Sequence, residues 1–175
     1  MTSADEILAQ LDAPAVVADA NRRRASRNGD APGLPVPPPS PDPAMFRGIL
    51  GDLALAADPT TEADPAGVLA SLLAGAGVAA GPKPHVQVGN TRHPLLIWPL
   101  LFGRTGSGRK GEATDTAEIF LRAAVWDWAD ISVTGLSSGK GLIERVRDPQ
   151  SEDDASGTMD KRLCVTETEF SCSDA

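Results

Sequence analysis

The sequence has no tyrosine, and its aromatic residues make up only 4% of the 175 positions. Proteins that hold single-stranded nucleic acid by stacking need aromatic side chains beneath successive bases. The formal net charge of −8 also argues against a broadly basic surface of the kind that covers DNA or RNA. Base stacking and a general basic coat are therefore not expected, while a local basic stripe is compatible with the composition.

Cysteine and histidine are equally scarce, with two of each. Cys164 and Cys172 lie near the C-terminal end, and the chain begins with an acidic segment that lacks the apolar core of a secretory signal. A disulfide framework is therefore not expected. His85 and His93 have no cysteine or carboxylate partners at ligand spacing, so no zinc site is predicted.

Long apolar runs are also missing from the sequence. A membrane-spanning helix needs roughly 18 or more consecutive apolar residues, and no segment approaches that length. We therefore expect a cytoplasmic protein without a membrane partner. A chain of 175 residues has room for about one domain.

Residues 1–43 differ in composition from the rest of the chain. Four arginines lie within residues 22–27, and a proline-rich stretch with almost nothing to bury follows them. Such a composition favours polyproline II structure or disorder. We predict a disordered Arg/Pro-rich arm over residues 1–43 and a folded domain over residues 44–175. The arginine cluster is interpreted mainly as a solvated tail, with contact to nucleic acid as the alternative.

The folded part alternates between helical and strand patterns. Two helices are expected before residue 82, where apolar residues recur at near-helical spacing. Strands are expected at residues 85–89, 95–103, 131–135 and 162–170, with helices within residues 111–130 and 135–149. Residues 95–103 are apolar on both faces, as in a central parallel strand, although Pro99 is awkward in a ladder. This order predicts an α/β fold with right-handed crossovers.

A glycine-rich loop follows the apolar segment. Gly103-Arg104-Thr105-Gly106-Ser107-Gly108 has the glycine spacing of a phosphate-binding loop, in which backbone N–H groups surround a phosphate at a helix N-terminus. The usual pattern continues with lysine and a hydroxyl residue that ligates magnesium. Here Arg109-Lys110-Gly111 follows, so the lysine is one position late and the hydroxyl is missing. Ser107, Thr105, Thr114 or a water molecule would have to replace it. A plain glycine-rich turn is the alternative interpretation.

An acidic residue at the end of a later strand favours the nucleotide interpretation. The segment RLCVTE places Glu167 after an apolar run. In phosphate-loop enzymes such a residue holds the magnesium shell or orients the attacking water. The alternative is an exposed strand end at which Glu167 and Glu169 are simply solvated. The loop and the acidic strand end together predict a nucleotide site.

These segments resemble the RecA-like P-loop ATPase domains of phage and mobile-element replication proteins. FGRTGSGRKGEAT is similar to the family's G-x-T-x-x-G-R-K-G-T-S loop, so the late lysine fits a family pattern. GLSSGKGLIERVRDP resembles GLSSGEGLI-x-x-VRDP, the most specific of the matches, and DKRLCVTETEF resembles the Walker B strand DKRL-x-V-x-E-x-EF. The resemblance covers roughly residues 44–171. It implies a partial P-loop NTPase core with a helical pair before it.

The resemblance also implies roles for individual residues, with ATP and Mg²⁺ as cofactors. Glu167 would be the catalytic residue beside the metal ion and the attacking water, with Glu169 behind it. The nucleotide-binding residues would be those of the loop, namely Gly103, Thr105, Gly106, Ser107, Gly108, Arg109, Lys110 and Gly111.

Two departures from the family pattern bear on activity. Glu112 and Ala113 stand where the family tends to place hydroxyl residues, so Glu112 is expected to bring negative charge near the phosphates. Gly139-Lys140 replaces a glycine–glutamate pair. The resemblance stops soon after the Walker B strand, so we expect a C-terminally truncated module with weak hydrolysis, because charge stabilisation is less effective in an open, wet site.

Three functions fit these features. The first is an ATP-binding and ATP-hydrolysing module of a DNA replication or mobile-element protein, helicase-like and acting in an oligomer or with a partner chain that completes the sheet. The second is a non-catalytic remnant that binds nucleotide without turnover. The third is an interaction domain whose glycine loop is structural and whose arginines contact nucleic acid or an acidic partner. The motifs favour the first two functions.

Overall fold

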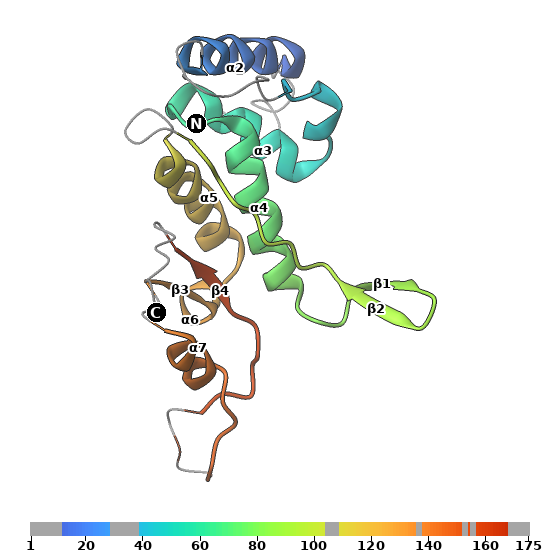
Figure 1. Cartoon of the computed structure of the whole chain (residues 1–175), viewed down its shortest axis with the longest axis vertical. Helices are drawn as coiled ribbons and strands as arrows, with labels where there is room; N and C mark the ends of the chain where they lie inside the picture. Colours follow the sequence, from blue (N-terminus) through green and yellow to red (C-terminus); the bar gives the residue numbers. More distant parts are fainter. Residues whose placement is uncertain are drawn as a thin grey trace. The chain divides into compact units, whose positions relative to one another are not determined.

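The computed structural model describes residues 12–28, 39–103, 109–135, 138–151, 154 and 157–167 (Figure 1). The fold is mixed α/β, as expected. The chain divides into two compact units, each considered by itself below. Unit 1 comprises Met1–Leu73 and Trp98–Phe120, and unit 2 comprises Ala74–Ile97 and Leu121–Ala175.

Unit 1 is built from helices. Its elements are α2 (Ala13–Asn28), η1 (Pro43–Phe46), α3 (Ile49–Ala57), η2 (Asp58–Thr60), and the N-terminal parts of α4 (Pro65–Ala80) and α5 (Lys110–Ala124). Its buried apolar side chains include Val17, Phe46, Leu55, Val68, Leu69, Leu72, Ala113 and Ala117. These residues form a core to which α2, η1, α3, α4 and α5 contribute.

The helix starts in unit 1 follow from local capping. The Asp64 carboxylate accepts the N–H of Ala66 at 2.9 Å, and Pro65 occupies the first turn of α4, where a missing N–H costs nothing. Asp42 accepts the N–H of Ala44 at 2.8 Å in the same way at the start of η1. The second of the two helices expected before residue 82 is therefore confirmed.

The expected disorder of residues 1–43 is wrong for Ala13–Asn28, which form α2. Helix α2 packs on α3 and η1. Its Val17 and Ala20 are buried, so this segment has apolar residues to bury despite its basic composition. Tertiary packing of these two side chains stabilises a helix that the composition alone does not predict.

The arginine cluster of α2 is engaged within unit 1. Arg23 forms an ion pair with Asp58, and Arg24 Nε donates to the carboxylate of Asp64 at 2.7 Å. Arg22, in contrast, forms an ion pair within α2 itself, with Asp19 at 2.9 Å. Arg23 and Arg24 therefore do not belong to a solvated tail, and contact of the arginine cluster with nucleic acid stays a prediction.

Unit 2 contains both strand pairs of the described residues. β1 (His85–Val88) and β2 (Thr91–Pro94) form an antiparallel hairpin in which Val88 faces Thr91, drawn as two adjacent arrows in Figure 1. Gly89 has a φ of 57° in the connecting turn, a conformation that favours glycine. The strand predicted from residue 85 is confirmed.

The second strand pair is parallel. β3 (Ser132–Thr134) pairs with β4 (Cys164–Thr166), with Ser132 opposite Cys164 and Thr134 opposite Thr166. α7 (Gly139–Arg145) lies between them in the chain, so the segment is a strand–helix–strand crossover of the predicted α/β type. Ser138 caps α7, accepting the N–H of Gly141 at 3.4 Å.

The core of unit 2 lies around α6 (Trp128–Ile131). Trp128 and Ile131 are buried together with Leu121, the first α5 residue of this unit. A Cβ atom on Gly75 of α4 would lie 2.3 Å from Leu121 Cδ1, so a larger residue there would force the Leu121 side chain to move. The predicted helix over residues 111–130 is thus interrupted: α5 ends at Ala124, and Trp128 belongs to the separate helix α6.

The predicted central strand over residues 95–103 is wrong. These residues form no strand, and the side chains of Leu96, Trp98 and Phe102 are exposed. Pro94 and Pro99 lack backbone N–H groups, which removes two donors that a central ladder requires. The segment is apolar in composition but has no strand partner on either edge among the described residues.

Candidate functional site

The structure describes part of the predicted nucleotide site. The described residues are Gly103, Arg109, Lys110, Gly111 and Glu167. The predictions for Thr105, Gly106, Ser107, Gly108 and Glu169 fall outside the described residues.

Lys110 links the two described ends of the glycine loop. It is the first residue of α5, and its Nζ donates to the carbonyl oxygen of Gly103 at 2.9 Å. The ammonium group therefore lies over the base of the loop, beside the first turn of a helix. Free backbone N–H groups of a helix N-terminus and a lysine charge form the kind of environment that attracts a phosphate. The role of Lys110 in phosphate binding stays a prediction.

Arg109 precedes the helix in a left-handed conformation with a φ of 46°. Its guanidinium forms an ion pair with Glu62, and its Nε lies 3.9 Å from Glu112 Oε2. The side chain that was predicted to support phosphate binding is therefore engaged by carboxylates. A bound phosphate would have to compete with Glu62 for this arginine.

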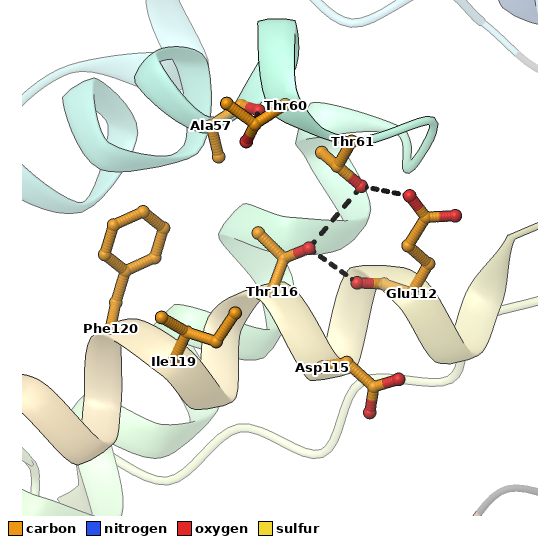
Figure 2. A pocket seen from close by; sticks show the side chains of 8 residues that line it. All are labelled: Ala57, Thr60, Thr61, Glu112, Asp115, Thr116, Ile119 and Phe120. Carbon is orange, nitrogen blue, oxygen red and sulfur yellow. Dashed lines mark hydrogen bonds between the residues drawn. The ribbon is translucent and has the colours of Figure 1, made fainter.

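Glu112 is held by the segment that connects α3 and α4. Its Oε1 accepts the hydroxyl of Thr61 at 2.6 Å and the backbone N–H of Glu62 at 2.7 Å. Figure 2 shows the Glu112 side chain turned toward Thr61. Two hydrogen-bond donors and the nearby Arg109 therefore surround this carboxylate. Its negative charge, expected to oppose phosphate binding, is thereby partly compensated.

Thr114 was one of the alternatives for the missing magnesium ligand. Its hydroxyl donates to the carbonyl oxygen of Lys110 at 3.2 Å, within α5. This is the common local bond of a helical threonine. A lone pair of the hydroxyl oxygen would still be available to a metal ion, but its proton is used by the helix.

A pocket of about 330 Å³ lies between α5 and the η2 region of unit 1 (Figure 2). It is lined by Ala57, Thr60, Thr61, Glu112, Asp115, Thr116, Ile119 and Phe120. The hydroxyl of Thr116 donates to the carbonyl oxygen of Glu112 at 2.7 Å. The sequence does not reveal this pocket, because Thr61 and Glu112 are far apart in the chain and nothing in their spacing links them.

Glu167 follows β4 and is exposed at the carboxyl end of the parallel strand pair. The predicted position of an acidic residue at a strand end is therefore confirmed. Glu167 belongs to unit 2, whereas Lys110 belongs to unit 1. Their joint action in one site stays a prediction.

Unit 2 contains a second cluster of charged residues around Arg162. Arg162 pairs with Asp127 and Asp160, and its Nη1 donates to the carbonyl oxygen of Ala79 at 3.1 Å. The hydrogen bonds from Arg162 hold the pKa of Asp160 below its usual value. A pocket of about 820 Å³ adjoins this cluster and is bordered by the exposed Trp126. The DKRL segment therefore contributes an ion-pair centre that the motif match did not reveal.

Among the described residues, no group of three or more histidine, cysteine, aspartate or glutamate side chains is arranged to hold a metal ion. Within the same ranges, the helices are too short or too polar to cross a membrane.

Comparison with protein-family models, with curated proteins and with solved structures gives no match to this chain.

Proposed function

We propose that this chain binds ATP through the loop that ends at Lys110, as a nucleotide-binding module of a DNA replication or mobile-element protein. The observation that carries the proposal is the hydrogen bond from Lys110 Nζ to the carbonyl oxygen of Gly103. It puts a positive charge over the base of a glycine-rich loop at the point where a long helix starts. The resemblance of the loop, the GLSS segment and the β4 segment to P-loop ATPases supports the same function.

The residues of the chain have separate tasks in this proposal. Lys110 and the first N–H groups of α5 bind the phosphates, and Arg109 joins them when it leaves Glu62. Mg²⁺ in such sites is bound mainly by phosphate oxygens and water with one or two protein oxygens, so a cluster of three protein ligands is not required. When bound, the ion would neutralise phosphate charge. Glu167 would orient water in a completed site.

Binding without turnover is the second candidate function. It is favoured by the arrangement of Arg109, whose guanidinium is engaged by Glu62 and lies near Glu112. An arginine paired with carboxylates stabilises the charge of a transferring phosphoryl group less well than one directed at it. Slow hydrolysis, or none, is therefore the expected result for the chain alone.

Thermal unfolding with and without Mg-ATP tests the proposal. ATP at about 100 times its dissociation constant should add roughly 2.7 kcal/mol to the free energy of unfolding, which raises the midpoint by about 5–11 °C in a chain of this size. Lys110→Ala should abolish the increase, whereas Lys140→Ala, an exposed lysine of α7, should keep it. Removing Mg²⁺ with a chelator should reduce the increase, because the phosphates would then face Glu62 and Glu112 with their full charge.

The midpoint shift also separates the two candidate functions. A shift in the parent that Lys110→Ala abolishes, together with phosphate release that Glu167→Gln abolishes, indicates an ATPase. The same shift without phosphate release indicates binding only. An unchanged midpoint at millimolar Mg-ATP would contradict nucleotide binding altogether.

A further inference from the structure

The pocket beside α5 has two chemically different ends. At one end lie the hydroxyl of Thr61 and the carboxylate of Glu112, and at the other lie the side chains of Ile119 and Phe120 (Figure 2). Asp115 points away from the other labelled side chains in this view. A ligand that fills the pocket must therefore combine a hydrogen-bonding part with an apolar, preferably flat, part.

The charges of the lining restrict the ligand further. Among the described residues that line the pocket, none is cationic, while Glu112 and Asp115 are acidic. An anionic group inside the pocket would thus be repelled. Carboxylates accept hydrogen bonds, so N–H and O–H donors on the ligand are favoured. A neutral group with several donors fits this lining better than a phosphate or a hydrocarbon.

The apolar end is open to a ligand. Ile119 is 68% exposed although it lines the pocket, and Phe120 beside it is only partly buried. Covering apolar surface of this kind contributes favourably to binding, at about 25 cal/mol per Å². Pockets that take small molecules typically combine such surface with a few polar groups that orient the ligand.

The pocket begins in the same turn of α5 as the proposed phosphate site, and Lys110 itself does not line it. Lys110 and Glu112 lie in the same first turn of α5, and the pocket follows the helix as far as Ile119 and Phe120. At about 1.5 Å per residue, Ile119 lies roughly 14 Å along the axis from Lys110. This reach is comparable to that of an extended nucleoside triphosphate, whose phosphates and base are at opposite ends.

We infer that this pocket binds the nucleoside part of the nucleotide whose phosphates lie beside Lys110. The base covers Ile119 and Phe120, and the ribose hydroxyls donate to the acceptors around Thr61 and Glu112. The inference rests on the proposed function, because the phosphates anchor the ligand at the start of α5. It adds the base-binding surface and the preference for a nucleoside over a bare polyphosphate.

Calorimetric titration of the full chain with Mg-ATP and with magnesium tripolyphosphate tests the inference. Tripolyphosphate carries the phosphates without the nucleoside, so it reports on the loop alone. The variant Ile119→Glu places a carboxylate at the apolar end of the pocket. Ile143→Glu in α7 is its matched control, because Ile143 is equally exposed at 68%. Circular dichroism establishes that both variants keep the helical content of the parent.

We expect Ile119→Glu to lose affinity for ATP and to keep its affinity for tripolyphosphate. The parent should bind ATP at least about tenfold more tightly than tripolyphosphate, and Ile119→Glu should remove this advantage while leaving tripolyphosphate binding unchanged. Ile143→Glu should behave as the parent does. Lys110→Ala should weaken the binding of both ligands.

Two results would overturn the inference in distinguishable ways. If ATP and tripolyphosphate bind equally well, or if Ile119→Glu binds ATP as Ile143→Glu does, the loop binds phosphates but the pocket does not bind the nucleoside. If neither ligand binds the parent, the proposed function fails, and the pocket inference fails with it.

Discussion

Arg162 joins several parts of unit 2 through its ion pairs and hydrogen bonds. It pairs with the buried Asp127, whose residue exposure is 8%, and it also bonds Asp160 and the carbonyl oxygen of Ala79. The Oδ1 atom of Asp127 is buried without a hydrogen-bond partner in the described structure. Arg162 is therefore the main compensation for a buried negative charge, and its removal leaves that charge poorly solvated.

The first prediction concerns this ion pair. Arg162→Met should lower the free energy of unfolding by about 2–4 kcal/mol, because it isolates the Asp127 carboxylate. Urea denaturation measures the loss. Arg145→Met, an exposed arginine of α7, should change stability by less than about 0.5 kcal/mol. Adding Asp127→Asn to Arg162→Met should recover part of the loss, and a double variant as unstable as the sum of both singles would contradict the pairing.

Glu112 illustrates what a single residue reveals from sequence and what it does not. The sequence shows its charge and its position in the first turn after the loop. The sequence does not show its hydrogen-bond partners, because Thr61 and Glu62 come from a segment whose approach depends on tertiary packing. The sequence predicted a charge near phosphates, and the structure adds the donors that hold it.

Among the elements, helix α2 departs most from the sequence prediction. Two of its arginines join it to acidic residues beside η2 and α4, and these pairs are partly buried. Partly buried ion pairs contribute more than exposed ones, since water and salt screen them less. The docking of α2 should therefore depend on Arg23 and Arg24 in addition to its buried Val17 and Ala20.

The second prediction tests this docking. The double variant Arg23→Ala and Arg24→Ala should lower the free energy of opening of the α2 amides by about 1–2 kcal/mol in native-state hydrogen exchange. Arg22→Ala is the control, because Arg22 pairs with Asp19 within α2 itself. Protection of α2 should also fall with rising salt in the parent. Equal protection in the double variant and the control would show that apolar burial alone docks the helix.

Elements defined by local signals were predictable, and those defined by distant partners were not. The start of α4 at Pro65 and the Ser138 cap of α7 depend on residues within a few positions of each other. Such contacts can be predicted from the spacing of the residues in the sequence. Residues 95–103 have the composition of a central strand, but a strand also requires neighbours on both edges, which composition does not supply. The mixed α/β class was predictable, whereas the partners of each strand were not.

At the scale of the whole molecule, the most apolar segment of the chain is also one of its most exposed. Large side chains between residues 95 and 102 lie at the surface, including Leu100 and Trp98. Exposed apolar surface is normally reduced in soluble proteins unless a ligand or partner covers it. The environment of Trp98 therefore distinguishes an open segment from a strand that is paired in solution.

The last prediction uses the three tryptophans as reporters of this difference. Trp98 and Trp126 are 90% and 94% exposed, whereas Trp128 is 1% exposed. Acrylamide should thus quench the fluorescence of Trp98 and Trp126 strongly and that of Trp128 only weakly. Trp98→Phe should remove a large part of the quenchable emission, and Trp126→Phe, the matched control, should remove a similar part.

Weak quenching of Trp98 by acrylamide would contradict the open segment. If residues 95–103 pair as a central strand in solution, Trp98 would be shielded, and Trp98→Phe would lower the protected emission instead. Raising the protein concentration would then increase protection if a second copy supplies the neighbouring strand, since association depends on concentration. Quenching of Trp98 that is strong and independent of concentration would instead agree with the open segment described here, and it would leave the apolar surface exposed in the isolated chain.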